Sequence, residues 1–249
     1  MKWPNSPSWS ALKEATVPGA EGNYVLSLIE CGELKAPSGK LVCCDPFAGM
    51  EKFGNSYVQI PPGKYKVIVT LADVSKENDG SHYREAYASL VLNGDSVETE
   101  RRLLCPSKNG HIEDSSLEED EYMGFGVDAG TACFVDQQSL EEGMPPHDEW
   151  YEGLFENEKT DSWFNLMDNK NHIREGIANI ILPQSTCNNN LILFHSGWGD
   201  GVYPIIGGYD VSGNLIAIHI DFMVIGDRTD EINTTDKSPN SKKPWWKFW

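Results

Sequence analysis

Short apolar runs bounded by turn-forming residues constrain the fold of this chain more than any other sequence feature. The run Tyr65–Ala72 is rich in β-branched residues and comes just after a Pro-Pro-Gly sequence, a pattern typical of a strand that begins after a turn. Two further runs, Tyr87–Leu92 and Val97–Leu103, flank the dipeptide Asn93-Gly94, which can supply the positive φ angles of a tight turn. We therefore expect a strand in the first segment and a β-hairpin in the other two.

Three more apolar runs follow near the C-terminus. They cover Leu191–Phe194, Val202–Ile206 and Leu215–Ile225, and Gly-rich turn sequences separate them. Runs of this length between turn residues are typical of strands. We expect them to form a meander within one sheet, together with the earlier strands.

Helical patterns are fewer and lie in two places. Ser8–Ala15 begins with a residue suited to a helix N-cap. Between about residues 139 and 175, Trp150, Leu154 and Phe155 recur at helical spacing. Because strands outnumber helices, we expect a mainly β fold with sandwich-like antiparallel sheets, a small helical insertion and an N-terminal helix.

Acidic residues are concentrated in one segment of the chain. Between Asn109 and Glu158 there is no Lys or Arg but there are fifteen acids, which supply most of the net charge of −18. A surface that carries mostly negative charge speeds association with a basic protein and disfavours binding to nucleic acid, which is also negative. A solvated acidic surface that only keeps the protein soluble is the alternative. The residues expected to contact such a partner are Glu113, Asp114, Glu118, Glu119, Asp120 and Glu121.

The C-terminal residues form a second unusual feature. We expect residues 1–226 to form a single β-rich domain and residues 227–249 to be a flexible linker with a basic, aromatic tail. Three of the eight tryptophans fall within the last five residues, next to lysines. Such a tail can dock on a partner, on the domain itself or weakly on a membrane surface. Its candidate contact residues are Trp245, Trp246, Phe248 and Trp249.

The cysteines and the hydropathy pattern exclude several classes of protein. No CxxC motif or His-rich segment accompanies the six cysteines, so no zinc site, other metal site or cofactor is expected. The chain has no signal-peptide pattern at its N-terminus and no apolar stretch of membrane-spanning length. We therefore expect a cytoplasmic protein with reduced thiols.

Three segments resemble a known family. They are Gly39–Phe47, Gly126–Asp136 and Ser196–Pro204, the last of which contains the sequence Gly-Asp-Gly. Together with Pro62–Tyr65 and Ile220–Phe222, they resemble the bacterial domain-of-unknown-function family 4241. The resemblance covers about residues 30 to 225 and implies no reaction, because the family has no established activity.

Several acidic and imidazole side chains within these segments could converge on one site. Asp128, His195, Asp200 and Asp221 are the candidate catalytic residues, with Asp45 and His219 as further members of such a cluster. Carboxylates and imidazoles bind divalent cations and act as general acids and bases. Asp in Gly-Asp-Gly or Asp-Pro sequences also commonly holds a turn by accepting backbone hydrogen bonds, which is the structural alternative for each residue.

Two functions from different classes follow from these features. The first is a non-enzymatic cytosolic binding protein, in its most specific form an immunity-type protein that neutralises a basic toxin through an acidic surface. The second is a metal-assisted hydrolase that uses Asp128, His195, Asp200 and Asp221 around the Gly-Asp-Gly loop. The spatial arrangement of these four side chains distinguishes the two.

Overall fold

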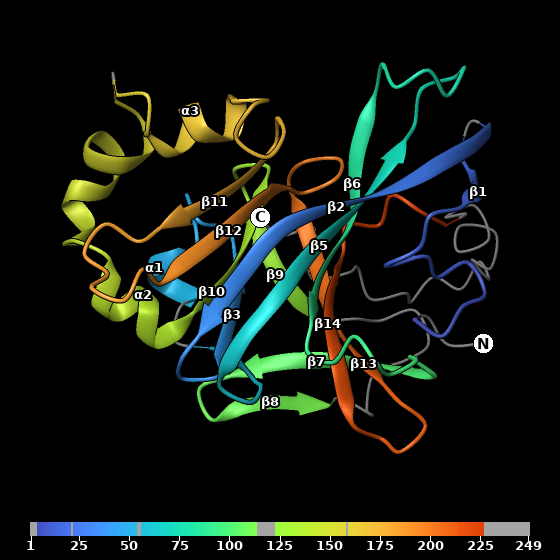
Figure 1. The fold of residues 1–249 in the computed structure, drawn as a ribbon, viewed down its shortest axis with the longest axis horizontal. Coiled ribbons are helices and arrows are strands. Elements are labelled where there is room, and N and C mark those ends of the chain that lie inside the picture. Colours follow the sequence, from blue (N-terminus) through green and yellow to red (C-terminus); the bar gives the residue numbers. More distant parts are fainter. Residues whose placement is uncertain (1–3, 21, 54–55, 114–122, 158, 227–249) are drawn as a thin grey trace, which may run out of the picture.

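Two antiparallel sheets form the body of the molecule. The computed structural model describes residues 4–20, 22–53, 56–113, 123–157 and 159–226 (Figure 1). The strands of the larger sheet follow one another in space as β1 (Thr16–Gly19), β2 (Gly22–Ala36), β5 (Gly63–Asp73), β6 (Tyr83–Val91), β14 (Leu215–Asp221), β13 (Gly201–Tyr209), β7 (Glu100–Ser107) and β8 (Gly110–Glu113). A further strand, β9 (Gly124–Val127), pairs with β13.

The smaller sheet is buried on both faces. Its strands follow the order β11 (Ile177–Ile181), β12 (Asn190–His195), β10 (Thr131–Asp136), β3 (Lys40–Cys44) and β4 (Val58–Gln59). Because side chains alternate along a strand, Phe134 and Phe194 pack into the core shared with the larger sheet, whereas Cys133 and Leu193 pack into a second core on the other side. Burial of both faces explains why β12 is a continuous apolar run.

The second core lies beneath the helical insertion, which covers the outer face of the smaller sheet (Figure 1). The insertion contains helices α2 (Gln137–Gly143) and α3 (Trp163–Asp168), a 3₁₀ turn (His147–Glu149) and a π-helical turn (Tyr151–Phe155). A separate short helix, α1 (Met50–Phe53), follows β3. The caps have the expected chemistry, since Asp136 accepts a hydrogen bond from the Ser139 N–H and Ser162 accepts one from the Asn165 N–H. The prediction of a mainly β fold with a small helical insertion is confirmed.

The N-terminal helix predicted over Ser8–Ala15 is wrong. Residues 4–15 instead form a series of turns that lies against the larger sheet, with Trp9 and Ala11 buried. Leu12 has a φ of 57°, which a right-handed helix does not allow, and its N–H donates to the Thr70 hydroxyl at 3.1 Å. A tertiary contact therefore replaced the helix that the local pattern favoured.

The hairpin predicted around Asn93-Gly94 is also wrong. Strands β6 and β7 do not pair with each other, because β14 and β13 lie between them. Neither residue of the dipeptide has a positive φ, and Asn93 instead accepts a hydrogen bond from the Asp95 N–H within a wider connection. The predicted C-terminal meander is correct for β13 and β14, which pair with each other, whereas β12 belongs to the smaller sheet.

Candidate functional site

Asp45 holds together two of the segments that the sequence singled out. Its side chain is 1% exposed. One carboxylate oxygen accepts the N–H groups of Phe47 and Ala48, at 2.8 and 3.0 Å. The other accepts those of Asp128 and Ala129, at 2.8 and 2.7 Å. With four backbone donors on its two oxygens, Asp45 acts as a structural bracket between the end of β3 and the turn before β10.

Asp200 has a similar role in the loop that joins β12 to β13. Its carboxylate accepts the Gly130 N–H at 3.0 Å, while the Gly130 carbonyl accepts the Ser196 N–H at 3.0 Å. The loop requires glycine at Gly197, where φ is 59° and a Cβ atom would lie 2.9 Å from the Cβ of Phe222. The Gly-Asp-Gly sequence thus fastens this loop to the turn that Asp45 also holds.

The four candidate catalytic residues do not form one compact cluster. Asp128 and Asp200 are exposed and lie on the two joined loops, and His195 ends β12. Asp221 is buried at the end of β14, where it accepts the Met223 N–H at 2.8 Å. Over the described ranges, no group of three or more His, Cys, Asp or Glu side chains is arranged to hold a metal ion.

A buried polar network accounts for His219, which the sequence analysis named as a further member of a possible acidic and imidazole cluster. The His219 Nδ1 atom lies 2.8 Å from the Ser89 hydroxyl, and its Nε2 atom lies 2.8 Å from a Glu98 carboxylate oxygen. This order resembles a catalytic triad, but Ser89 and His219 are 0% exposed. Trp9 packs against the imidazole with ring centroids 5.4 Å apart. The network is therefore a buried structural element in this structure, with no exposed nucleophile.

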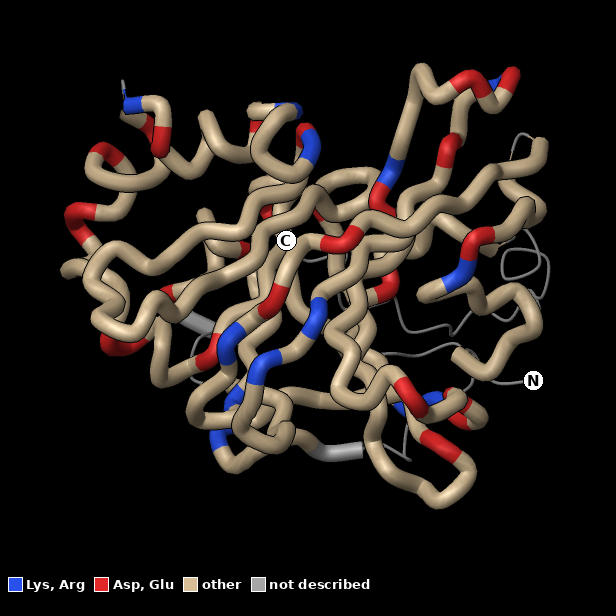
Figure 2. The backbone as a smooth tube through the Cα atoms, viewed as in Figure 1, with Lys and Arg blue, Asp and Glu red and all other residues tan. Residues whose placement is uncertain are grey.

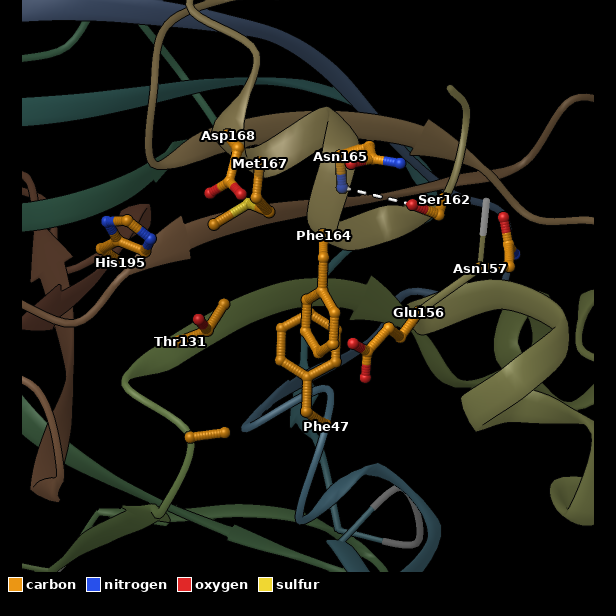
Figure 3. Close-up of a pocket in the computed structure, with 11 residues that line it drawn as sticks. Phe47, Thr131, Glu156, Asn157, Ser162, Phe164, Asn165, Met167, Asp168 and His195 are labelled. Atoms are coloured by element: carbon orange, nitrogen blue, oxygen red, sulfur yellow. Dashed lines mark hydrogen bonds between the residues drawn. The ribbon is translucent and has the colours of Figure 1, made fainter. Parts of the chain in front are cut away.

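A pocket of about 590 Å³ opens between α3 and the two joined loops (Figure 3). Carboxylates and aromatic rings line it: Glu156 and Asp168 come from the insertion, Phe164 comes from α3, and Phe47 comes from the loop after β3. Thr131 at the start of β10 and His195 at the end of β12 complete the wall nearest the sheet. Of the described residues that line the pocket, none is Lys or Arg.

The aromatic side of the pocket rests on well-packed rings. The centroid of the Phe47 ring lies 4.7 Å from that of Phe164 and 5.0 Å from that of Phe155, which in turn lies 5.1 Å from the ring of Trp163. Trp163 is 2% exposed. This packing anchors the aromatic side of the pocket in the second core.

His195 is neutral at neutral pH. Burial is the main cause that lowers its pKa; Asp168 and Glu175 oppose the shift, and Arg84 and Arg174 add to it. The imidazole therefore offers one hydrogen-bond donor and one acceptor to the pocket, and the formal charges on the pocket wall are the two carboxylates.

The helical insertion, which supplies part of the pocket wall, carries many exposed acids. Figure 2 shows acidic positions distributed along the helical insertion, with few basic ones among them. The exposed acids of residues 137–170 outnumber the exposed lysines, which are Lys159 and Lys170. These exposed acids are Glu141, Glu142, Asp148, Glu149, Glu152, Glu156, Asp161 and Asp168.

Most of the partner contacts predicted from sequence lie outside the described residues. Glu113 ends β8, and Asp114, Glu118, Glu119, Asp120 and Glu121 lie outside the described residues, as do Trp245, Trp246, Phe248 and Trp249. Sequence reasoning found the acidic segment but missed the pocket, for which Phe47, Phe164 and Asp168 carry no local motif. No helix in the described part of the chain is long and apolar enough to cross a membrane.

Comparison with known proteins gives a family but no activity. The family model described as "Protein of unknown function (DUF4241)" matches residues 34–220, in agreement with the resemblance seen in the sequence. No curated protein and no solved structure matches the chain.

Proposed function

The chain belongs to the DUF4241 family of proteins of unknown function, and from its structure we propose that it is a non-enzymatic protein that binds a basic protein partner. The pocket beside α3 carries this proposal, because it combines the carboxylates of Glu156 and Asp168 with the rings of Phe47 and Phe164. Lys and Arg side chains fit such a lining, since their charged ends pair with carboxylates and their stems and cations pack on aromatic rings.

The acidic surface supports the same proposal at longer range. Eight exposed acids lie on the helical insertion, and two of them, Glu156 and Asp168, line the pocket. A surface with this excess of negative charge raises the rate of encounter with a basic protein. In its most specific form the proposal is a cytoplasmic, immunity-type protein that neutralises a basic toxin by receiving one of its Lys or Arg side chains.

The alternative, a metal-assisted hydrolase, has less support. The Asp200 carboxylate already accepts the Gly130 N–H, and Asp221 lies buried at the end of β14. An acidic pocket with a neutral imidazole suits binding of a cation without requiring a reaction.

Calorimetric titration with a Lys/Arg-rich peptide, against a Glu-rich peptide of the same length, tests the proposal. We expect the basic peptide to bind at low salt and the acidic one not to bind. The double variant Glu156→Gln/Asp168→Asn should weaken binding by about fivefold or more, since each lost contact with a charge is worth up to about 1 kcal/mol.

The matched control removes the same charge from the same insertion outside the pocket. Glu141→Gln/Glu142→Gln changes two exposed acids on α2 that do not line the pocket, so affinity should fall much less. If the two double variants lost the same affinity, only the overall negative charge of the insertion would act and not the pocket. If the basic peptide did not bind at all, the proposal would be overturned.

A further inference from the structure

Two arginines beside His195 carry polar atoms that nothing in the described structure satisfies. Arg84 Nε and Arg174 Nη1 are buried and have no hydrogen-bond partner; across the described residues no other buried side-chain nitrogen or oxygen lacks one. Leaving a buried donor unpaired is costly, and native proteins rarely do so without a reason. The positive charges of Arg84 and Arg174 lower the pKa values of Glu85 and His195, so both arginines lie near these two side chains.

Aromatic rings hold both guanidinium groups. The Arg84 guanidinium lies 5.1 Å from the centroid of the Trp198 ring, and that of Arg174 lies 4.9 Å from the centroid of the Tyr83 ring. Within the described part of the chain, neither arginine has a carboxylate within 4.0 Å. Stacking on a ring orients a guanidinium but leaves its N–H donors free for another acceptor.

The two aromatic rings that contact these arginines are exposed to solvent. Trp198 is 53% exposed and Tyr83 is 37% exposed, and both arginines remain partly exposed. Trp198 belongs to the loop that contains the Gly-Asp-Gly sequence, so the glycine-rich connection presents a large apolar ring at the surface. An exposed indole over a guanidinium is a ready platform for a planar ligand group.

The buried acid Glu85 does not fully cancel the positive charge at this place, and the other two acids that act on His195, Asp168 and Glu175, are exposed to solvent. Glu85 is 4% exposed, and burial raises its pKa to about 7, although Arg174 and Arg84 act in the opposite direction. Near neutral pH this carboxyl group is therefore partly protonated, and two guanidinium charges face at most one buried negative charge. A phosphate dianion balances such a pair better than a single carboxylate does.

We propose that Arg84 and Arg174 form a binding site for the phosphate group of a small molecule, with Trp198 as the stacking surface for the remainder of that ligand. A phosphate that binds a guanidinium in place of the ring contact would accept a hydrogen bond from Arg84 Nε or Arg174 Nη1, which have no partner among the described residues. Arg84 and Arg174 do not line the acidic pocket, and the site does not depend on the function proposed for that pocket.

Calorimetric titration of the full chain with inorganic phosphate, phenyl phosphate and acetate tests this site. We expect both phosphates to bind and acetate to bind much more weakly. Phenyl phosphate should bind more tightly than inorganic phosphate, by about fivefold or more if its ring stacks on the indole. Trp198→Ala should remove that difference while inorganic phosphate still binds.

Three arginine variants complete the experiment. Arg84→Gln and Arg174→Gln should each weaken phosphate binding by about tenfold, as expected for the loss of a charge-assisted hydrogen bond, and Arg174→Lys should retain part of the affinity. Arg102→Gln is the matched control, because Arg102 pairs with Glu100 at 2.9 Å in the same sheet, and it should bind like the wild type. Circular dichroism would confirm that each variant is folded.

Three results would overturn the site: no binding of either phosphate at millimolar concentration, acetate binding as tightly as phosphate, or an equal loss in Arg102→Gln. The pocket variant Glu156→Gln/Asp168→Asn removes only negative charge and should bind phosphate at least as tightly as the wild type, so failure of this site and failure of the basic-partner proposal can be told apart.

Discussion

At the scale of single residues, acidic side chains of the same type have different roles that only their neighbours reveal. Asp45 is buried and accepts four backbone N–H groups, whereas Asp128 is exposed and contributes its own backbone N–H to that bracket. The sequence showed both as aspartates within motif-like segments. The distinction could not be predicted, because two of the four partners of Asp45, the N–H groups of Asp128 and Ala129, lie more than eighty positions away along the chain.

Asp45→Asn should destabilise the protein by about 3 kcal/mol. The substitution removes the charge and turns an amide N–H₂ group toward backbone donors, which leaves buried N–H groups unpaired. Asp128→Asn is the control and should change the free energy of unfolding by less than about 0.5 kcal/mol, as expected for an exposed position. Urea denaturation of the two variants measures both values, and equal stability of the two would contradict the bracket role of Asp45.

Glu85 should make the free energy of unfolding fall as the pH rises. Because burial raises its pKa from 4.5 to about 7 in the folded protein, the folded state holds a proton that the unfolded state has lost between these two pH values. The cost reaches roughly 3 kcal/mol once the pH exceeds the folded pKa. Glu85→Gln should therefore be more stable than the wild type above about pH 7 and similar to it below about pH 4.

Thermal or urea unfolding of both proteins across this pH range checks the prediction. A stability difference that does not change with pH would mean that Glu85 titrates normally in the folded state.

At the scale of elements, the strands were more predictable than their partners, of which only the pairing of β13 with β14 was predicted correctly. The strand predicted at Tyr65–Ala72 is β5, since alternation and flanking turn residues are local signals. The hairpin around Asn93-Gly94 failed because β6 and β7 each pair with strands from the C-terminal part of the chain. The N-terminal helix failed for a related reason: residues 4–15 pack on a sheet face formed by distant segments.

The N-terminal segment 4–15 should contribute to stability through Trp9. This ring packs on Tyr87 with centroids 4.8 Å apart and covers His219. Trp9→Ala should lower the free energy of unfolding by about 3 to 5 kcal/mol, the usual cost of removing a buried Trp ring, and should open the Ser89–His219–Glu98 network to water.

Trp9→Phe is the control, since it keeps an aromatic ring over the imidazole and should cost less. Urea denaturation gives both free energies, and hydrogen exchange at the Ser89 amide reports the opening. A Trp9→Ala variant as stable as the wild type would show that the segment lies on the sheet without supporting it.

At the scale of the whole molecule, the sequence predicted the charge but not the sites. The acidic segment was visible as a run without Lys or Arg. The pocket combines residues from the loop after β3, from β10, from β12 and from the insertion, and no single segment carries its signature. Arg84 and Trp198 are likewise brought together only by the fold, as are Arg174 and Tyr83.

The position of β14 between β6 and β13 has a consequence for synthesis on the ribosome. Strands β2, β5 and β6 pair with neighbours close in sequence, so they can associate while the nascent chain is still growing. The other edge of β6 then has no partner until residues 215–221 emerge, more than a hundred residues later. During that interval an apolar strand edge is open to pairing with other chains, and β14, the last strand within the described residues, is the one that covers it.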